Sequence, residues 1–258
     1  MGLLDECYVG FVNMDHRRDR LARMQRELDR VGLPATRHRG MKPEEYVGDP
    51  KRVEKMRNRT PGAIGCYFSQ VGIMAKALAL GKHAFVMEDD LVFCDDFFNR
   101  VDLMRQFVVD HDWDVIWLGG TVHINPPYWH KGLGRDAETT DHPNFLRAYG
   151  AFCTYAYLVN GESLDQVLQL LDETLDQTIG IDYSFIQFQP RILAYTFVPG
   201  CVTQYDNQSD IGKGVTRFSG FLKMNGTVEN SAYVFQKRLS DFDPTKFNWH
   251  EAGERRSW

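Results

Sequence analysis

The stretch Phe85-Val86-Met87-Glu88-Asp89-Asp90 decides how the rest of the chain is interpreted. Its apolar first half predicts a buried strand, and three consecutive carboxylates follow that strand directly. Adjacent carboxylates that lose hydration repel one another, and a bound cation offsets this cost. Oxygen ligands of this kind suit Mg²⁺ or Mn²⁺, and open α/β sheets hold ligands at the carboxyl ends of their strands. The alternative is a solvated turn after an edge strand.

Strand-like and helix-like segments alternate on both sides of this stretch. Strands are predicted at 8–12, 85–87 and 114–120, within 145–159, and at 191–198. Helices are predicted at 21–31, 61–81, 97–108 and 163–175. Residues 36–59 are basic and lack apolar periodicity, so we interpret them as a solvated face. Residues 121–144 are predicted to form a long polar loop of functional importance. The alternation predicts an α/β fold with a mostly parallel central sheet flanked by helices.

Length and composition narrow the classes of protein further. With 258 residues and 43% hydrophobic content, the chain is expected to form one sizeable domain with appended elements. A net charge of −5 provides no general attraction to nucleic acid or anionic membranes, so any phosphate site must be local. Apolar runs long enough for a signal peptide or a transmembrane helix are missing from the sequence, which favours a cytoplasmic protein. Five scattered cysteines, without CxxC spacing, predict neither a disulfide framework nor a zinc site.

Four segments, taken in order, resemble the motifs of glycosyltransferase family 25, the lipopolysaccharide and collagen galactosyltransferase group. They are Val12-Asn13-Met14-Asp15-His16-Arg17-Arg18-Asp19-Arg20-Leu21, Gly62-Ala63-Ile64-Gly65-Cys66-Tyr67-Phe68-Ser69-Gln70, Glu88-Asp89-Asp90, and Gln204-Tyr205-Asp206-Asn207-Gln208-Ser209-Asp210-Ile211. The chain departs from the family pattern at Met14 (usually Leu), Ala63 (usually an acid) and Gln70 (usually His). Each motif alone is weak, but four in the family's order are a specific signal. No resemblance is found beyond Gly214.

This resemblance implies a single GT-A type domain over residues 1–258. About 120 N-terminal residues would bind the nucleotide sugar, and residues 121–258 would bind the acceptor and supply a C-terminal lid and tail. The implied activity is a metal-dependent, inverting transfer of a hexose, galactose or glucose, from a UDP-sugar. The acceptor would be a hydroxyl of a glycan, a lipid-linked molecule or a protein. The loop at 121–144 would then lie on the acceptor side.

The acidic turn supplies the implied metal site. By resemblance, Glu88 and Asp90 hold Mn²⁺ or Mg²⁺ as the outer members of a DxD-like motif, and Asp89 reaches the ribose or the sugar. The cation bridges the diphosphate oxygens and acts as a Lewis acid on the leaving group. Asp95 and Asp96 are interpreted differently, as favourable charge at the N-terminus of the next helix.

The resemblance implies that two segments, at residues 13–20 and 204–217, contact the donor together with Asp89. Asn13 and Asp15 suit a base or ribose, and the arginines suit phosphate. The alternative for Arg17 and Arg20 is a solvated helix start with salt bridges to Asp15 or Asp19. The full predicted donor set is Asn13, Asp15, Arg17, Arg20, Asp89, Gln204, Ser209, Asp210, Lys213 and Arg217. Lys213 and Arg217 would lie on a closing lid with glycine hinges, or else on an ordinary surface turn.

Asp182 is the predicted general base, because it follows the Leu-rich helix in the order that the resembled family uses. An inverting transferase needs a carboxylate that takes the proton from the acceptor hydroxyl. The alternative is that Asp182 only caps the following segment. His123 is a weaker candidate for the base.

Two other classes of function compete with this interpretation. A nucleotidyltransferase would use a similar acidic turn and metal but would attack the α-phosphate and release pyrophosphate. A non-catalytic carbohydrate-binding module would stack sugars on aromatic residues, for which the candidates are Trp113, Trp117, Tyr128, Trp129 and Trp249. The sequence predicts neither the acceptor's identity nor the oligomeric state.

Overall fold

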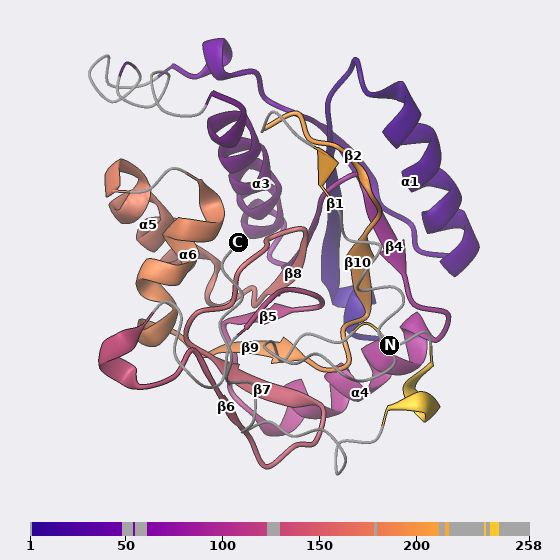
Figure 1. The fold of residues 1–258 in the computed structure, drawn as a ribbon, viewed down its shortest axis with the longest axis vertical. Coiled ribbons are helices and arrows are strands. Elements are labelled where there is room, and N and C mark those ends of the chain that lie inside the picture. Colours follow the sequence, from indigo (N-terminus) through magenta and orange to yellow (C-terminus); the bar gives the residue numbers. More distant parts are fainter. Residues whose placement is uncertain are drawn as a thin grey trace.

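The structure, a computed structural model, is built around one eight-stranded mixed sheet (Figure 1). The structure describes residues 2–47, 54, 61–122, 130–177, 180–211, 215–216, 235 and 238–242. The strand order is β2-β1-β3-β8-β5-β9-β7-β6. These strands are β1 (Cys7–Asn13), β2 (Thr36–Arg39), β3 (His83–Met87), β5 (Val115–Trp117), β6 (Ala137–Thr139), β7 (Phe145–Ala148), β8 (Ala156–Val159) and β9 (Ala194–Phe197).

Most strands of the sheet run in one direction. Both β2 and β3 pair with β1 in parallel, and β9 pairs with β5 in parallel. The exceptions are β8, which lies antiparallel between β3 and β5, and β7, which pairs antiparallel with β9 and β6. The predicted α/β fold with a mostly parallel central sheet is therefore confirmed.

Five α-helices are described, and they cover both faces of the sheet. They are α1 (Arg18–Val31), α3 (Pro61–Ala79), α4 (Phe97–Asp110), α5 (Leu164–Thr174) and α6 (Ile181–Phe188). Helices α3, α5 and α6 pack on one face, while α1 and α4 pack on the other (Figure 1). Strand β3 explains why both faces are covered, because its buried side chains alternate between them. Ala84 and Val86 pack in the core under α3, α5 and α6, and Phe85 and Met87 pack in the core under α1 and α4. None of the described helices is long and apolar enough to cross a bilayer.

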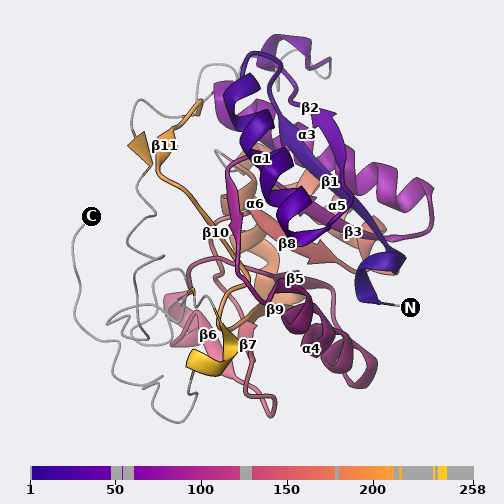
Figure 2. The ribbon, with the colours of Figure 1, turned by 90° about the vertical axis from the view of Figure 1, so that its right-hand side faces the viewer.

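Two smaller strand pairs bring a distant part of the chain to the end of β3. Strand β10 (Val202–Gln204) pairs antiparallel with β4 (Leu91–Phe93), which directly follows the acidic turn. Strand β11 (Asn207–Gln208) then pairs with β12 (Val215–Thr216). Figure 2 shows the chain leading from β10 to β11 along one side of the molecule. Residues 204–210 are thereby placed next to the acidic turn.

Two connecting segments contain strands that the sequence did not predict. Residues 36–39, predicted as part of a solvated face, form the edge strand β2, and a 3-10 turn follows at Pro43–Glu45. Residues 137–139, predicted within a loop, form the edge strand β6. An edge strand can be largely exposed, as β2 is, and then lacks the apolar alternation by which a strand is predicted from sequence.

Candidate functional site

The acidic turn lies between β3 and β4, at the carboxyl end of β3. Its main chain is held on both sides: Glu88 N–H donates to Tyr155 O at 2.9 Å, and Tyr205 N–H donates to Asp90 O at 3.1 Å. Asp89 and Asp90 are buried, with 6% and 5% exposure, and Glu88 is half-buried. The predicted place of the turn in the fold is therefore correct. A buried acidic turn also excludes the alternative of a solvated one.

Asp89 is neutralised by groups from the first strand and helix. One carboxylate oxygen accepts a hydrogen bond from Arg20 Nη1 at 2.9 Å, and the other accepts one from Asn13 Nδ2 at 2.6 Å. Burial raises the pKa of Asp89, while the charge of Arg20 and the bond from Asn13 oppose the rise. Each oxygen of Asp89 thus has a partner within the protein. Each can still accept a second hydrogen bond, and the predicted contact with a ribose or sugar stays a prediction.

Arg20 joins the acidic turn to the 204–210 segment. Besides Asp89, its Nη1 lies 3.4 Å from Asp90 Oδ2, and its Nη2 donates to Gln208 O at 2.7 Å and to Asn207 Oδ1. Burial lowers the pKa of Arg20, but the charges of Asp90 and Asp89 outweigh this effect and raise it. In this state Arg20 acts as an internal cross-link, and its predicted contact with phosphate stays a prediction.

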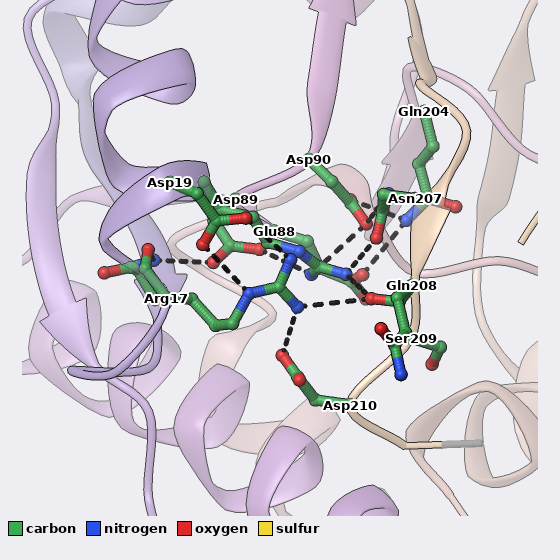
Figure 3. Close-up of polar contacts among 12 residues, drawn as sticks. Arg17, Asp19, Glu88, Asp89, Asp90, Gln204, Asn207, Gln208, Ser209 and Asp210 are labelled. Carbon is green, nitrogen blue, oxygen red and sulfur yellow. Dashed lines mark hydrogen bonds and ion pairs between the residues drawn. The ribbon is translucent and has the colours of Figure 1, made fainter. Parts of the chain in front are cut away.

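Arg17 makes a second, more exposed cross-link. Its Nη1 donates to Asp210 Oδ2 at 2.8 Å and to Gln208 O at 3.2 Å, and its Nη2 pairs with Asp19 at 3.0 Å (Figure 3). The pair with Asp19 is the salt bridge that the alternative interpretation of this helix start predicted. Asp15 is exposed and pairs instead with Arg37 at 2.6 Å.

Arg20 contacts the carboxylates of Asp89 and Asp90, whereas the amides at Glu88 are neutral. Gln70 Nε2 donates to Oε1 at 3.2 Å, and Gln204 Nε2 donates to Oε2 at 3.2 Å. Burial raises the pKa of Glu88 well above its ordinary value, and the charges of Asp90, Asp182 and Asp89 raise it further. The ionised form of this carboxyl therefore lacks compensation, which a bound cation would supply.

The donor set partly fits the predicted cation. Gln204 Nε2 also donates to Asp90 Oδ1 at 2.8 Å, so one amide bridges Glu88 and Asp90 (Figure 3). One amide nitrogen therefore contacts both carboxylates, so Glu88 and Asp90 lie side by side in the turn, and carboxylate oxygens are the ligands that Mg²⁺ and Mn²⁺ prefer. Within the described residues, however, no three His, Cys, Asp or Glu side chains gather as a ligand set. Asp210 pairs with Arg17, and His16 Nε2 lies 3.7 Å from Asp210 Oδ1.

Asp182 occupies the first turn of α6. Gly180 is the N-cap of this helix, so the capping alternative for Asp182 is wrong. The Asp182 carboxylate instead faces the segment before β8: Oδ1 accepts hydrogen bonds from the Thr154 N–H at 3.0 Å and from the Thr154 hydroxyl. Burial raises the pKa of Asp182, and the Thr154 bonds partly oppose the rise. Its charge raises the pKa of Glu88, which places the two carboxyls within electrostatic reach of one another.

The remaining predicted residues have varied outcomes. Gln204 joins the acidic turn, and Ser209 Oγ accepts a bond from Ile211 N–H at 3.1 Å. Asp96 is the N-cap of α4, as expected of its position. Lys213, Arg217 and His123 lie outside the described residues.

Several residues of the site were not predicted. Asn207 donates to Asp90 Oδ2 at 3.0 Å, Gln70 contacts Glu88, and Thr154 holds Asp182. Asn207 and Gln70 lie within motifs that the resemblance rests on, so the motifs already contained a signal for them. Thr154 stands in no such motif, and only the packing of α6 against the strand brings it to Asp182.

Solved structures that are similar to this chain include two transferases. The chain matches no protein-family model and no curated protein. One similar solved structure is a glycosyltransferase involved in the glycosylation of the major capsid of PBCV-1, with 10% identity, 74% of this chain and 81% of the other covered, and a TM-score of 0.38. Another is a putative glucose-1-phosphate thymidylyltransferase from Bacillus anthracis, with 10% identity, coverage of 78% and 73%, and a TM-score of 0.37.

Proposed function

We propose that the protein is a metal-dependent, inverting glycosyltransferase that moves galactose or glucose from a UDP-sugar to a hydroxyl of a glycan, lipid-linked or protein acceptor. The observation that carries the proposal is the convergence at the carboxyl end of β3. There Asn13 and Gln204 contact the acidic turn, and the charge of Asp182 acts on Glu88; these three residues come from distant parts of the chain. The order of the motifs, which resembles family 25 and its GT-A fold, supports the same proposal.

The donor half of the proposal concerns charge. Cleavage of the bond between sugar and diphosphate builds negative charge on the leaving group, and Mn²⁺ or Mg²⁺ held by Glu88 and Asp90 would neutralise it. Arg20 neutralises Asp89 and holds the turn in place. Asn13, next to the end of β1, lies where open α/β sheets hold nucleotides. Glu88 is then the carboxylate with the most to gain from the cation, because its contacts are neutral groups: the amides of Gln70 and Gln204 and the thiol of Cys66.

The acceptor half of the proposal concerns the proton that the acceptor hydroxyl loses when it attacks the sugar. Asp182 is anchored through Oδ1 by Thr154, which leaves Oδ2 as the oxygen that can take the proton from an acceptor hydroxyl. The burial that raises the pKa of Asp182 also makes it a better proton acceptor than an exposed aspartate. A base of this kind acts as the hydroxyl attacks the anomeric carbon from the side opposite the diphosphate.

Calorimetry of UDP binding tests the donor half. UDP should bind with Mn²⁺ or Mg²⁺ and lose most of its affinity in EDTA, and Asp90→Ala should abolish the difference. Asp95→Ala is the matched control, because Asp95 is half-exposed and pairs with Arg30 at 3.7 Å, away from the turn. Equal affinity with EDTA and with Mn²⁺ in the wild type would remove the metal from the proposal. With a UDP-sugar, release of UDP is expected. A nucleotidyltransferase would instead consume UTP and a sugar 1-phosphate and release pyrophosphate, so this second reaction is assayed separately.

A further inference from the structure

Gln70 and Tyr157 stand behind Glu88 and take no part in the proposed chemistry. Gln70 belongs to α3 and Tyr157 to β8, and both side chains are fully buried, with 0% exposure. Gln70 Nε2 donates to Glu88 Oε1 at 3.2 Å, and the Tyr157 hydroxyl donates to Gln70 Oε1 at 3.0 Å. A line of two hydrogen bonds therefore leads from the centre of the sheet to the acidic turn.

The chemistry of these groups fixes which one donates in each of the two hydrogen bonds. An ionised carboxylate only accepts hydrogen bonds, so the NH₂ end of the Gln70 amide must face Glu88. The carbonyl end then faces Tyr157, whose hydroxyl must donate. A rotation of the amide by half a turn would set its oxygen against the carboxylate and leave no acceptor for the tyrosine proton. The Tyr157 hydroxyl thus selects the orientation of the amide that suits Glu88.

Tyr157 is well suited to this role because it is rigidly placed. It is paired in register with Val86 of β3 and with Trp117 of β5, in the middle of the sheet. Its ring stacks on Trp117 at a centroid distance of 6.1 Å and meets Phe185 edge to face at 5.3 Å. The hydroxyl therefore has little freedom to follow a shift of Gln70.

A second amide holds the other oxygen of Glu88. Gln204 of β10 donates to Oε2 at 3.2 Å, but it also donates to Asp90. Gln70 touches the acidic turn only at Glu88, and its other amide contact is Cys66 Sγ, at 3.4 Å. Loss of Gln70 should therefore affect Glu88 and spare Asp90, which distinguishes it from loss of Gln204.

We propose that Tyr157, acting through Gln70, is a positioning residue that sets the direction of the Glu88 carboxylate toward the cation and diphosphate of the donor. The proposal rests on the proposed function, because it takes Glu88 to meet the donor. Partners that orient a ligating carboxylate typically change metal affinity by about 10- to 100-fold when they are removed. The pair would act on donor binding, and neither residue would touch the donor.

Three variants test the pair: Tyr157→Phe, Gln70→Leu and the double variant. Tyr67→Phe is the matched control, because Tyr67 is also a buried tyrosine, and its hydroxyl donates to Leu171 O at 2.6 Å, away from Glu88. Two quantities are measured. The first is the side-chain amide signal of Gln70 in ¹H–¹⁵N spectra, identified by its absence in Gln70→Leu. The second is the Mn²⁺ concentration that gives half-maximal UDP binding.

Tyr157→Phe should move the Gln70 amide signal, and Tyr67→Phe should leave it unchanged. Tyr157→Phe and Gln70→Leu should each raise the required Mn²⁺ concentration by about 10-fold or more. The double variant should be no worse than Gln70→Leu alone, because Tyr157 acts only through Gln70. UDP affinity in EDTA should stay the same in all variants.

The two readouts separate the proposal from the function it rests on. An unmoved Gln70 signal in Tyr157→Phe, or independent effects that multiply in the double variant, would overturn the positioning role. If the signal moves but the Mn²⁺ requirement of Tyr157→Phe matches that of Tyr67→Phe, the role in donor binding is overturned. If wild-type protein binds UDP without a metal, the proposed function fails by itself, and with it the donor-directed role of the pair.

Discussion

At the scale of single residues, the acidic turn divides its charge between two kinds of environment. Asp89 faces Arg20 and is neutralised within the protein. Glu88 faces amides and lies within reach of the charge of Asp182. Uncompensated carboxyls of this sort are typical of functional sites, since they are kept at a cost to stability. The cost and the role can be tested separately.

The role of Asp182 is tested by Asp182→Asn. Both Thr154 bonds end on Oδ1, so an asparagine carbonyl oxygen can accept both and keep the local structure. UDP-sugar binding should therefore be nearly unchanged. Transfer should fall by about 10²- to 10⁴-fold, because general-base assistance is lost. UDP release is measured with a panel of sugar acceptors, and donor affinity by calorimetry.

Either of two results would contradict this role of Asp182. Transfer within a few-fold of wild type would move the base to another residue, such as His123 or Asp210. Loss of donor binding would instead assign Asp182 to the donor site.

The loss of folding stability that the Glu88 carboxylate causes is tested by Glu88→Gln in metal-free protein. Because the folded-state pKa of Glu88 is raised, the folded protein holds the proton at pH values where the unfolded chain has released it. Stability should therefore fall as pH rises from the ordinary glutamate pKa through the raised value. Glu88→Gln should remove this part of the fall and raise the melting temperature at neutral pH by about 2–4 °C, or roughly 1 kcal/mol.

Melting temperatures from pH 4 to 8 in EDTA measure this effect. Glu45→Gln is the control, since Glu45 is exposed, pairs with Arg39 at 2.9 Å, and has its pKa lowered by that arginine. Its replacement should change stability little and in the opposite sense. A Glu88→Gln protein that is less stable than wild type at neutral pH would show that the carboxylate stabilises the fold.

At the scale of elements, the site depends on how closely β10 approaches the end of β5. Cys201 N–H donates to Leu118 O at 2.7 Å, just before the strand that carries Gln204. Gly119 makes this approach possible, because a Cβ there would lie against Val202 O and 2.8 Å from the Tyr155 hydroxyl. The backbone oxygen cannot move aside without moving β10.

Gly119→Ala should therefore destabilise the protein by about 1–3 kcal/mol and weaken metal-dependent UDP binding by displacing Gln204. Gly72→Ala is the matched control: Gly72 lies in α3, and a Cβ there would meet nothing within 4 Å. That change should be stabilising, by about 0.5–1 kcal/mol. Denaturant unfolding and calorimetry measure the two effects. Similar effects of the two changes on stability would contradict the role given to Gly119.

At the scale of the whole molecule, the first helix region is joined to the segment at residues 204–210. Arg17 and Arg20 of the first helix region both bond to Gln208 O, about 190 residues away along the chain by the sequence numbering. The second half of the chain also enters the sheet, where β8 lies between β3 and β5. The nucleotide-binding and acceptor-binding halves predicted for the chain would therefore share one sheet.

Hydrogen exchange tests whether the segment at residues 206–220, which follows β10, closes on the donor. UDP with Mn²⁺ should slow exchange across residues 206–220, because Lys213 and Arg217 are predicted to meet the diphosphate. Helix α5, which packs against α3 and α6, should show no change. Asp90→Ala should remove the protection. Unchanged exchange at 206–220 with saturating ligands would disprove the lid.

The sequence by itself determined the α/β class, the main strands and helices, and the position of the acidic turn at the end of a buried strand. These features follow from local periodicity, which a helix or strand imposes over a few residues. It did not reveal β2 and β6, because exposed edge strands carry little apolar alternation. Motif order suggested that Gln204 and Asp182 belong with Glu88, but could not supply their contacts.

Only the tertiary structure decided how the carboxylates are compensated. The pKa of a side chain depends on burial and on charges within a few ångströms, and these come from segments far apart in the sequence. Asp89 and Glu88 are neighbours in one turn, yet α1 brings an arginine to the first while α3 and β10 bring amides to the second. Their different environments, and with them their different proposed roles, arise from packing that a local pattern does not encode.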